Sequence, residues 1–479
     1  MSVKKKLPKL ELIITFDEIP GKKRGVMSFS QALKEGALYK KPGDFDKRLA
    51  AITQEDIATL IYTSGTTGLP KGVMLSHGNF AHNVNQSIDH FVPRLNSKDI
   101  FLSILPLSHA FERTTGYYIP VVFGISVAFV ENITTTLLED LVAVRPTVFV
   151  SVPRIFEKIH AAVLSRLADA SSFKKALFGW TIKVAAQNMS YNCLDKPRRG
   201  LFAMKYNIAD KLVFSKLKKA VGFENINFIV SGGGALSVSD AEFFLGMDIK
   251  MCEGYGLTET SPVTHANKPN FIKKGTVGQP LKDTLTKISD DGEILIKGPQ
   301  VMVGYYKDKS GTKETFTKDG FLKTGDKGVV DEEGFLTITG RIKDIIITAG
   351  GKNISPQNIE GRLKESLYIE HVALIGDRRK YLSALVVPNF EELKKWAKKN
   401  GVAASSDSEL INDAKVIAFF DADIKNRMKV FARVEQIRRF TLLVNEWSQQ
   451  TGELTPSLKV KRHVIEEKYA AQIEEMYKE

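Results

Sequence analysis

The chain has 479 residues, of which 43% are hydrophobic and 26% charged, so it can bury a large core and does not have the composition of a disordered protein. Its formal net charge of +13 suits an anionic membrane surface or a polyanionic ligand such as a nucleotide. The lysines are scattered and no nucleic-acid-binding motif occurs, so nucleic acid is excluded as a partner.

The sequence also bears on the compartment. Cys193 and Cys252 lie in neither a metal-binding nor a redox spacing, which predicts a reduced cytoplasmic protein. Residues 10–16 are mostly apolar, but Asp17 and Glu18 follow at once, so this stretch is too short and too soon charged for a secretory signal peptide. No apolar run reaches membrane-spanning length. A helix is predicted over residues 28–38, with Ser28 as its N-terminal cap.

The most informative stretch reads Tyr62-Thr63-Ser64-Gly65-Thr66-Thr67-Gly68-Leu69-Pro70-Lys71-Gly72. Residues 57–62 lead into it as an apolar run and predict a buried strand. Glycines let the backbone approach a ligand closely, and hydroxyls, N–H groups and a lysine together make an anion site. We therefore predict a loop that holds phosphate oxygens. It is not a Walker A loop, because glycine follows Lys71. The alternative is an ordinary surface turn.

Further strands and helices alternate after this loop, which predicts a largely parallel sheet. Helix is expected over residues 75–90, and strands over residues 100–105, 124–130 and 148–152. A polar cluster that includes His109 follows the first of these strands. Because open α/β sheets bind ligands at the ends of their strands, His109 either lines a substrate pocket or is a capping or core histidine.

Residues 157–223 are predicted to be long basic helices. Apolar residues recur there at helical spacing: Leu201, Ile208, Leu212, Val213, Leu217 and Val221. Lysines occupy the other faces: Lys205, Lys211, Lys216, Lys218 and Lys219. Such helices can lie on an anionic membrane. Most amphipathic helices pack on their own domain with a solvated polar face, and we predict that arrangement here.

Two glycine-rich segments follow. The strand expected over residues 226–230 runs into Ser231-Gly232-Gly233-Gly234-Ala235-Leu236, where three glycines allow a flat ligand to come very close. The second segment reads Glu253-Gly254-Tyr255-Gly256-Leu257-Thr258-Glu259-Thr260. Its aromatic ring offers a stacking face for a base, and its hydroxyl and carboxylate can hold phosphate and a hard cation. The alternative is a polar loop without a ligand.

From residue 278 the pattern changes to short strands and turns, which predicts a small β-rich subdomain. Within it, Asp326 is expected to be exposed and able to accept two hydrogen bonds from a vicinal diol. The charged pair at Lys343 and Asp344 marks the predicted boundary between two domains, residues 1–342 and residues 343–479. Lys459 lies in a polar segment of the second domain, where a lysine is usually only solvated.

These segments resemble, in sequence and in order, the motifs of the AMP-forming acyl-CoA synthetases, a family of adenylate-forming enzymes. The stretches LPLSHAFER, GGKNISP and LTPSLKVKR are similar to those of bacterial long-chain fatty acid–CoA ligases. The resemblance covers the chain from about residue 50 to its end. It implies an α/β fold, in which a large N-terminal adenylation domain with parallel-sheet layers and a small β-rich subdomain precedes a small, mobile α+β C-terminal domain.

The resemblance also implies roles for single residues. Those that would bind ATP or AMP are Thr63, Ser64, Gly65, Thr66, Thr67, Gly68, Lys71, Gly233, Gly234, Ala235, Glu253, Gly254, Tyr255, Gly256, Thr258, Asp326, Arg341 and Lys343. Tyr255 would stack on the adenine, and Asp326 would hold the ribose hydroxyls. Thr258 would contact the α-phosphate, Glu259 and Thr63 would hold Mg²⁺, and Lys459 would complete the catalytic group formed with Thr258 and Glu259.

The remaining implied roles concern the other substrates. His109 and Phe111 would line the acyl pocket, and Gly350 and Gly351 the tunnel for CoA. Lys343 would be the hinge about which the C-terminal domain turns. Leu458 stands where many members of the family have glycine, and Lys461 is the rival to Lys459 for the catalytic lysine.

The implied activity is the ATP-dependent activation of a fatty acid, expected to be long-chain, through an acyl adenylate and its transfer to CoA, with release of AMP and pyrophosphate. Mg²⁺ is the implied cofactor, and fatty acid, ATP and CoA are the implied substrates. A cytoplasmic enzyme is expected. A peripheral contact with the anionic inner membrane surface, and a homodimer, are left open.

One departure from the family pattern leaves two alternatives. Members of the family have a much longer segment before the loop at residue 62, so an unpaired sheet edge is expected here. The chain is then either active alone or binds nucleotide and needs a complementary N-terminal chain. A third reading is an acyl-AMP ligase that loads a carrier protein. The uninterrupted loop at Gly350 and Gly351 favours CoA.

Overall fold

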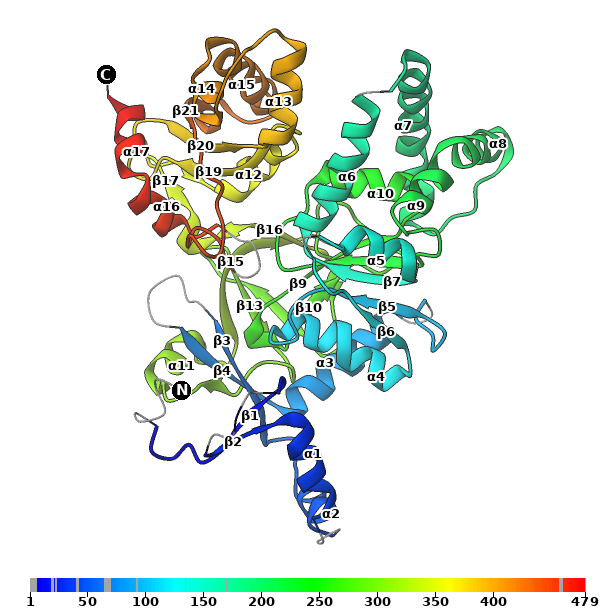
Figure 1. The fold of residues 1–479 in the computed structure, drawn as a ribbon, viewed down its shortest axis with the longest axis vertical. Coiled ribbons are helices and arrows are strands. Elements are labelled where there is room, and N and C mark those ends of the chain that lie inside the picture. The colour runs from blue at the N-terminus through cyan, green and yellow to red at the C-terminus, as the bar shows by residue number, and fades with distance from the viewer. Residues whose placement is uncertain are drawn as a thin grey trace. The chain divides into compact units, whose positions relative to one another are not determined.

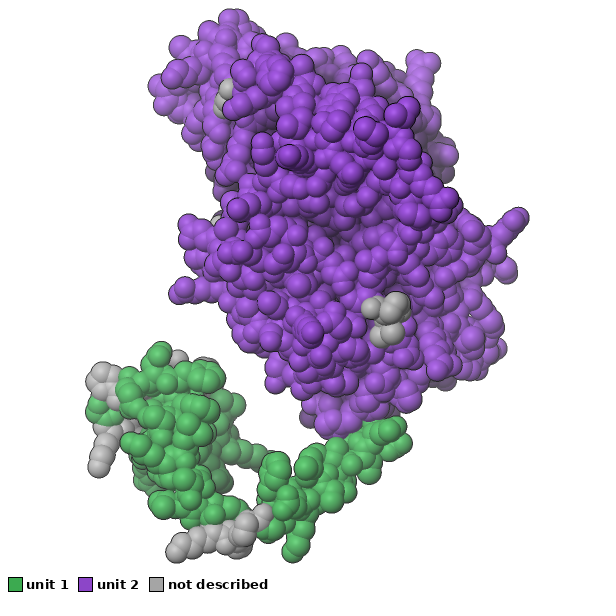
Figure 2. Space-filling view, turned by 90° about the vertical axis from the view of Figure 1, so that its right-hand side faces the viewer, with its two compact units in different colours: residues 1–56 green, residues 57–479 purple. Residues whose placement is uncertain are grey.

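The computed structural model describes residues 7–18, 21, 24–39, 43–63, 70–91, 94–133, 135–168, 170–455 and 460–478. The chain forms two compact units, Met1–Asp56 and Ile57–Glu479, which are coloured separately in Figure 2. No helix of the described residues is long and apolar enough to cross a membrane.

Unit 1 is small and has little core. Strands β1 (Ile13–Thr15) and β2 (Val26–Ser28) pair in parallel, and helices α1 (Phe29–Ala37) and α2 (Gly43–Ala50) follow. The predicted cap is confirmed, since the Ser28 hydroxyl accepts a hydrogen bond from the backbone N–H of Gln31 at 3.3 Å. Neither helix buries a residue.

Unit 2 is built on a seven-stranded sheet with the strand order β11-β10-β9-β8-β7-β5-β6 (Figure 1). The strands are β5 (Ile100–Ser103), β6 (Ser126–Phe129), β7 (Val148–Ser151), β8 (Phe228–Ser231), β9 (Met251–Gly256), β10 (Val263–Ala266) and β11 (Gln279–Pro280). All neighbours from β9 to β6 are parallel, and β10 and β11 add antiparallel edges. The largely parallel sheet predicted from the alternating pattern is therefore confirmed.

Helices pack against this sheet and bury its central strands, whereas the edge strand β6 stays partly exposed. They are α3 (His77–Phe91), the π-helix η2 (Glu112–Tyr118), α4 (Ile119–Phe123), α5 (Leu137–Val144), α6 (Pro153–Ala168), α7 (Ser172–Cys193), α8 (Gly200–Ala209), the π-helix η3 (Asp210–Phe214), α9 (Ser215–Ala220) and α10 (Val238–Gly246). Strands β7 and β8 are buried at every residue. This explains why they read in the sequence as continuous apolar runs rather than as alternating patterns.

The helical segment 157–223 packs differently from our prediction. Val213, Leu217 and Val221 contact the core as expected. Leu201 and Ile208 do not, because 85% of the Leu201 surface and 52% of the Ile208 surface are exposed. The prediction that the apolar residues of this segment pack on their own domain is therefore wrong for α8.

A separate three-stranded sheet carries the phosphate-loop segment. Its order is β14-β4-β3, all antiparallel, with β3 (Ile57–Thr63), β4 (Lys71–Ser76) and β14 (Gly304–Tyr305). The strand expected over residues 57–62 is present, but our prediction that it is buried is wrong. Only Ile61 is buried, whereas Tyr62 is 61% exposed. Among the described residues β3 pairs with β4 alone, so it is an edge strand with one open side.

The predicted β-rich subdomain is an antiparallel sheet of four strands in the order β12-β13-β15-β16. These strands are β12 (Leu285–Ile288), β13 (Glu293–Lys297), β15 (Leu322–Val330) and β16 (Leu336–Arg341). Helix α11 (Lys309–Thr315) precedes β15, and the short 3₁₀ turn η4 (Thr258–Thr260) follows β9.

The chain from residue 342 onward forms the predicted α+β structure around a sheet with the order β19-β20-β21. The strands of this sheet are β19 (Ile369–Ile375), β20 (Leu382–Pro388) and β21 (Ile437–Leu442). Strands β17 (Ile346–Ile347) and β18 (Asn353–Ile354) form a separate two-stranded sheet. The helices of this part of the chain are η5 (Ile342–Asp344), α12 (Pro356–Lys364), α13 (Phe390–Lys399), α14 (Asp407–Asn412), α15 (Ala414–Met428), η6 (Arg433–Glu435), α16 (Arg462–Lys468) and α17 (Ala470–Tyr477).

Alternate residues of β19 and β20 face different helices. Val372 and Val386 pack with α12 to α15, whereas Ala373 and Leu385 pack with α16 and α17. Figure 1 shows these two helix groups on either side of the sheet. Because both faces are covered, all seven residues of β20 are buried. A domain boundary at residue 342 stays a prediction.

The core of unit 2 offers a direct test of the fold. Phe149 is fully buried on β7, with ring centroids of Phe156 and Phe223 at 5.8 and 5.6 Å. We expect Phe149→Ala to lose about 3–5 kcal/mol of the free energy of unfolding, because it leaves a cavity. Phe173→Ala, at a side chain that is 77% exposed, is the control and should change it little. Equal effects in a urea titration would contradict this packing.

Candidate active site

A chain of contacts links Glu259, just beyond the end of β9, to residues of strands β14, β4 and β3. The Tyr305 hydroxyl donates a hydrogen bond to Glu259 Oε1 at 3.0 Å, and the Lys71 ammonium lies 4.7 Å from the centre of the Tyr305 ring. The same ammonium is 3.8 Å from Asp308 Oδ2. Thr63 is the register partner of Lys71 in the β3–β4 pair. We call Thr63, Lys71, Glu259 and Tyr305 the Glu259 cluster.

Tyr305 is the member of the Glu259 cluster that the sequence analysis missed. Burial and the neighbouring Glu259 carboxylate raise the pKa of Tyr305 well above its usual range, so the phenol keeps its proton and stays a hydrogen-bond donor. The sequence contained only a weak signal, because Gly304-Tyr305-Tyr306 reads as one more turn between strands. Its proximity to Glu259 arises when β14 pairs with β4.

A second group of residues surrounds Asp326. The Tyr255 hydroxyl donates to Asp326 Oδ2 at 2.8 Å, and Arg341 Nε donates to Asp326 Oδ1 at 2.7 Å. Asp326 and Arg341 are register partners on β15 and β16. Burial, and then the Asp326 carboxylate, raise the pKa of Tyr255 well above its usual range. We call these three residues the Asp326 cluster.

Our expectation that Asp326 is exposed is wrong, since only 3% of its surface is accessible. Side chains alternate along β15, and the position of Asp326 faces inward. A buried carboxylate is costly unless it is paired and hydrogen-bonded, and Arg341 and Tyr255 meet both needs. Each carboxylate oxygen keeps a further lone pair, so the cluster can still accept two hydrogen bonds from a ligand.

The glycine loop after β8 lies beside the start of β9. Ser231 and Glu253 are register partners, and the backbone N–H of Leu236 hydrogen-bonds the Glu253 carboxyl. Burial raises the pKa of Glu253 to about 8. Gly233, Gly234 and Ala235 are exposed, which leaves their backbone open to a ligand.

Two glycines of these segments lie in close contact with other parts of the chain. A Cβ at Gly256 would lie 1.8 Å from the carbonyl oxygen of Pro262, the residue just before β10. A Cβ at Gly232 would lie 2.8 Å from the Phe111 ring. Gly254 has only ordinary contacts, the nearest at 3.5 Å. The Phe111 contact brings the predicted acyl-pocket segment against the predicted adenine loop.

The segment that contains His109 continues into the π-helix η2. His109 is half-buried, and its backbone N–H donates to the Pro106 carbonyl at 2.9 Å. Glu112, three residues on, is buried and accepts hydrogen bonds from the Ser103 hydroxyl and from the backbone N–H groups of Ile104 and Leu105. Glu112 therefore links the end of β5 to η2, a role that the sequence analysis did not assign.

The remaining predicted residues lie elsewhere or outside the described residues. Lys343 is exposed in η5, two residues after Arg341. Gly350 and Gly351 are exposed at the turn between β17 and β18, and are in neither cluster. Thr258 is half-buried in η4 beside Glu259. Ser64, Gly65, Thr66, Thr67, Gly68 and Lys459 lie outside the described residues. Lys461, the rival lysine, is half-buried, and its backbone N–H donates to the Glu453 carbonyl at 2.7 Å.

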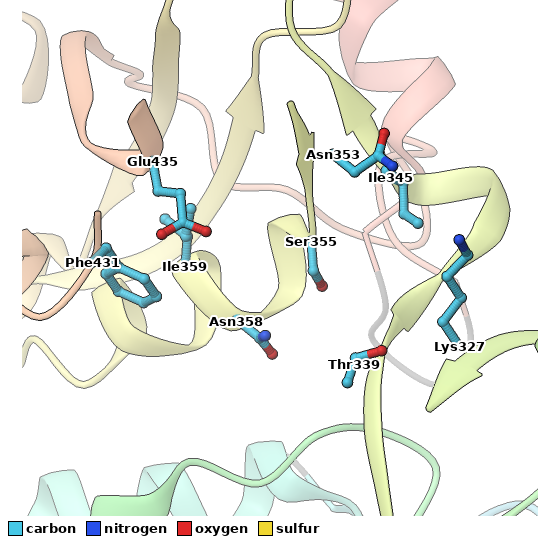
Figure 3. Close-up of a pocket in the computed structure, with 9 residues that line it drawn as sticks. All are labelled: Lys327, Thr339, Ile345, Asn353, Ser355, Asn358, Ile359, Phe431 and Glu435. Atoms are coloured by element: carbon cyan, nitrogen blue, oxygen red, sulfur yellow. The ribbon is translucent and has the colours of Figure 1, made fainter. Parts of the chain in front are cut away.

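A cavity of about 290 Å³ has Lys327, the residue after Asp326 on β15, in its lining (Figure 3). It is lined by Lys327, Thr339, Ile345, Asn353, Ser355, Asn358, Ile359, Phe431 and Glu435. Figure 3 shows Glu435 and Lys327 at opposite ends of it. None of the predicted site residues lines this cavity.

Comparison with known families decides the family of the chain. Residues 2–306 match the family model described as AMP-binding enzyme, and residues 343–479 match the AMP-binding enzyme C-terminal domain. The chain belongs to the AMP-binding enzyme family. The family resemblance predicted from the motifs is thereby confirmed.

This AMP-binding enzyme has close relatives among curated proteins. It is 39% identical over 450 residues to the long-chain-fatty-acid–CoA ligase FadD15 of Mycobacterium bovis, and the matched region covers 93% of this chain and 73% of the relative. It is 37% identical over 436 residues to the putative fatty-acid–CoA ligase fadD11 of Mycobacterium tuberculosis, covering 91% of this chain and 76% of the relative.

Solved structures share the fold of this AMP-binding enzyme. The adenylation domain of a carboxylate reductase from Mycobacterium chelonae aligns with a TM-score of 0.73 and 21% identity, covering 99% of this chain and 71% of that one. The O-succinylbenzoate coenzyme A synthetase of Bacillus subtilis in complex with AMP aligns with a TM-score of 0.58 and 24% identity, and the alignment covers 86% of this chain and 69% of the synthetase. At these identities the comparison establishes the fold, which agrees with the predicted fold class.

The buried Glu112 predicts how stability depends on pH. Burial raises the pKa of Glu112 from 4.5 to about 7, so the folded chain holds a proton that the unfolded chain releases. The contribution of protonated Glu112 to the free energy of unfolding is complete below the unfolded pKa of 4.5, and it is lost as pH rises from there through about 7. We expect Glu112→Gln to flatten the fall in the free energy of unfolding across that window, by up to about 1.4 kcal/mol per pH unit.

The control for this experiment is Glu314→Gln, at an exposed carboxylate. Urea titrations of the wild type and of both variants at several pH values measure the slope. A Glu112→Gln variant with the slope of the wild type would show that Glu112 does not hold the proton.

Proposed function

We propose that this AMP-binding enzyme activates a long-chain fatty acid with ATP and transfers the acyl group to CoA, releasing AMP and pyrophosphate. The observation that carries the proposal is the Glu259 cluster, in which Tyr305 contacts both Lys71 and Glu259, and Thr63 pairs with Lys71 across β3 and β4, in a chain 39% identical to a long-chain ligase. A hydroxyl, an ammonium and a carboxylate are the groups that hold a triphosphate with its cation.

The first step joins the fatty acid to AMP. A carboxylate transfers its acyl group poorly to a thiol, because its leaving group would be oxide. When a carboxylate oxygen attacks the α-phosphorus of ATP, an acyl phosphate anhydride forms and pyrophosphate leaves. The enzyme contributes positioning and charge stabilisation. The Thr258 hydroxyl would donate to the α-phosphate, and Lys71 and Lys459 would offset its negative charge.

The Glu259 cluster fits a magnesium ion. Tyr305 donates to one carboxylate oxygen, and a carboxylate has about four lone-pair sites, so capacity for a cation remains. The described residues contain no group of three or more His, Cys, Asp or Glu that could hold a metal by themselves. Mg²⁺ usually takes one or two carboxylates together with phosphate oxygens and water, which suits Glu259 with Thr63. When bound, it would offset charge on the phosphates.

The nucleoside end of ATP would lie at the Asp326 cluster. Tyr255 and Arg341 hold the Asp326 carboxylate in one orientation, and its free lone pairs would accept hydrogen bonds from the two ribose hydroxyls. The base would lie between the Tyr255 ring and the exposed backbone of Gly233, Gly234 and Ala235, and Glu253 and Gly254 would border it.

The acyl chain would enter between η2 and the glycine loop. His109 is half-buried there, and the Phe111 ring lies against Gly232, so these residues would form one wall of an acyl pocket. A fatty acid held in this place would present its carboxylate toward the phosphates.

In the second step the CoA thiolate attacks the acyl carbon and AMP leaves. We propose that residues 343–479 turn about Lys343 between the two steps and bring Gly350 and Gly351 to the CoA channel. In the present arrangement Arg154 of α6 forms an ion pair with Glu370 of β19, and the Ser165 hydroxyl donates to Glu392 at 2.9 Å. The turn would break both contacts. A homodimer and a complementary N-terminal chain stay predictions.

The proposal is tested by incubating the protein with palmitate, ATP, Mg²⁺ and CoA and analysing the products by mass spectrometry. We expect palmitoyl-CoA and AMP. Palmitoyl-AMP without thioester would instead support an acyl-AMP ligase that loads a carrier protein. A protein that binds ATP but forms neither product would support a chain that needs a complementary partner.

The catalytic lysine is tested by exchange of pyrophosphate into ATP, which isolates the first step. We expect Lys459→Ala to lower the exchange at least about 100-fold, because a positioned charge at the reacting phosphate is lost. Lys461→Ala, two residues away, should keep most of the exchange. The reverse result would assign the role to Lys461.

Tyr305 is tested through the magnesium dependence of the same exchange. Tyr305→Phe removes the hydroxyl that orients Glu259, and we expect about a 10- to 100-fold higher Mg²⁺ requirement, as for other residues that position a metal ligand. Tyr306→Phe, at the next and more exposed tyrosine, is the control. An unchanged Mg²⁺ dependence in Tyr305→Phe would show that this hydrogen bond does not orient the ligand.

A further inference from the structure

A row of exposed apolar side chains runs along α8 and into η3. The exposed fractions are 85% for Leu201, 64% for Met204, 52% for Ile208 and 43% for Leu212. Residues three and four apart lie on one face of a helix, so these four side chains form a continuous row. Figure 1 shows α8 at the right-hand edge of unit 2. The row is the feature that our prediction of a helix packed on its own domain did not anticipate.

The opposite face of the same helix accounts for its attachment to unit 2. Tyr206, Ala209 and Phe214 are buried. The Phe202 ring stacks on Tyr191 of α7 with a centroid distance of 5.0 Å. The helix is therefore held by aromatic contacts on one face, and the row of Leu201, Met204, Ile208 and Leu212 is not needed for that packing.

The surroundings of the row are strongly basic. We call residues 196–220 the basic arm. It contains one acidic residue, Asp210, and these basic ones: Lys196, Arg198, Arg199, Lys205, Lys211, Lys216, Lys218 and Lys219. Its net charge is therefore +7, more than half of the +13 of the whole chain. At about 100° per residue, Lys205 and Lys211 fall on opposite sides of the apolar row.

Most of this charge is not neutralised by the protein. Arg198 forms an ion pair with Asp248, and Lys218 with Asp210 at 3.2 Å. The other six basic residues of the arm have no ion pair within the part of the chain that the structure describes. A concentration of unpaired positive charge around an apolar row indicates a surface for an anionic partner.

We propose that the basic arm docks this protein on an anionic lipid surface. Apolar side chains of such a helix enter the boundary between headgroups and acyl chains, while long lysine side chains extend to the lipid phosphates. Each basic residue near an anionic leaflet adds to the attraction. A second copy of this chain does not suit the row, because two arms docked on each other, each with a net charge of +7, would repel.

The composition of the row favours lipid over an acidic protein partner. Protein interfaces concentrate their binding energy in a few aromatic and arginine residues that fill pockets. The exposed row contains none of these and consists of Leu201, Met204, Ile208 and Leu212 in a line. A lipid surface accepts such a row without a complementary pocket. The docking goes beyond the proposed ligase activity and does not depend on it, because binding can be measured without ATP or CoA.

The test is flotation of the full chain with two kinds of vesicle, phosphatidylcholine alone and phosphatidylcholine with one third phosphatidylglycerol. We expect binding to the mixed vesicles only, and weaker binding as salt is added. Leu201→Ser with Ile208→Ser, and separately Lys211→Glu with Lys216→Glu, should each weaken the partition at least about tenfold.

Two control variants match these changes elsewhere in the chain. Val430→Ser with Val434→Ser removes apolar side chains that are 69% and 56% exposed. Lys282→Glu with Lys398→Glu changes the net charge by the same amount at exposed positions. Both should bind as the wild type does, and circular dichroism verifies the fold of all four.

Three outcomes would overturn the proposal. These are no binding of the wild type to the mixed vesicles, equal binding to both kinds of vesicle, and binding of the arm variants that equals that of the wild type. The last outcome would assign any lipid contact to another surface.

Discussion

Strand β9 connects the core of unit 2 with its site. It pairs in parallel with β8 on one edge and antiparallel with β10 on the other, and its first residues, Met251 and Cys252, are buried. From there it runs outward through Glu253 and Tyr255 to Gly256, beyond which η4 carries Glu259. The close approach of Pro262 to Gly256 admits no Cβ, so a substitution there would separate β9 from β10. The positions of both clusters depend on this contact.

The two clusters use buried or half-buried hydrogen bonds to orient charged groups. Asp326 is held by Arg341 and Tyr255, and Glu259 is held by Tyr305. In each case a tyrosine hydroxyl whose pKa is raised acts as a donor that does not ionise near neutral pH. Orientation established before substrate binds reduces the reorganisation that a reaction requires, which is the main contribution of a protein to phosphoryl chemistry.

Strand β3 and the basic arm both expose apolar side chains, and they differ in charge. Strand β3 exposes Tyr62 and leaves one side unpaired among the described residues. The basic arm exposes Leu201 and its row within a segment of net charge +7. Its charge gives the arm a preference for an anionic surface, whereas the open side of β3 offers backbone groups that can pair with another strand. The two surfaces therefore call for different explanations.

The sequence by itself determined the class of the fold and supplied most of the residues of the candidate site as predictions. Continuous apolar runs separated by helical periodicity predicted a largely parallel sheet, because both faces of such a sheet are covered. Glycines beside hydroxyls and carboxylates predicted ligand loops, because close backbone approach and hard oxygen donors are local properties of residue type. Together with the family resemblance of these motifs, they allowed Thr63, Lys71, Glu259 and Asp326 to be chosen before the fold was seen.

Only the tertiary structure decided which residues meet and which side chains are exposed. Tyr305 reaches Glu259 because β14 pairs with β4, a contact between segments more than 200 residues apart. Asp326 is buried because Arg341 on the next strand compensates its charge. Leu201 is exposed although its helical spacing suits a core, since periodicity shows that a helix has an apolar face but not whether a partner covers it.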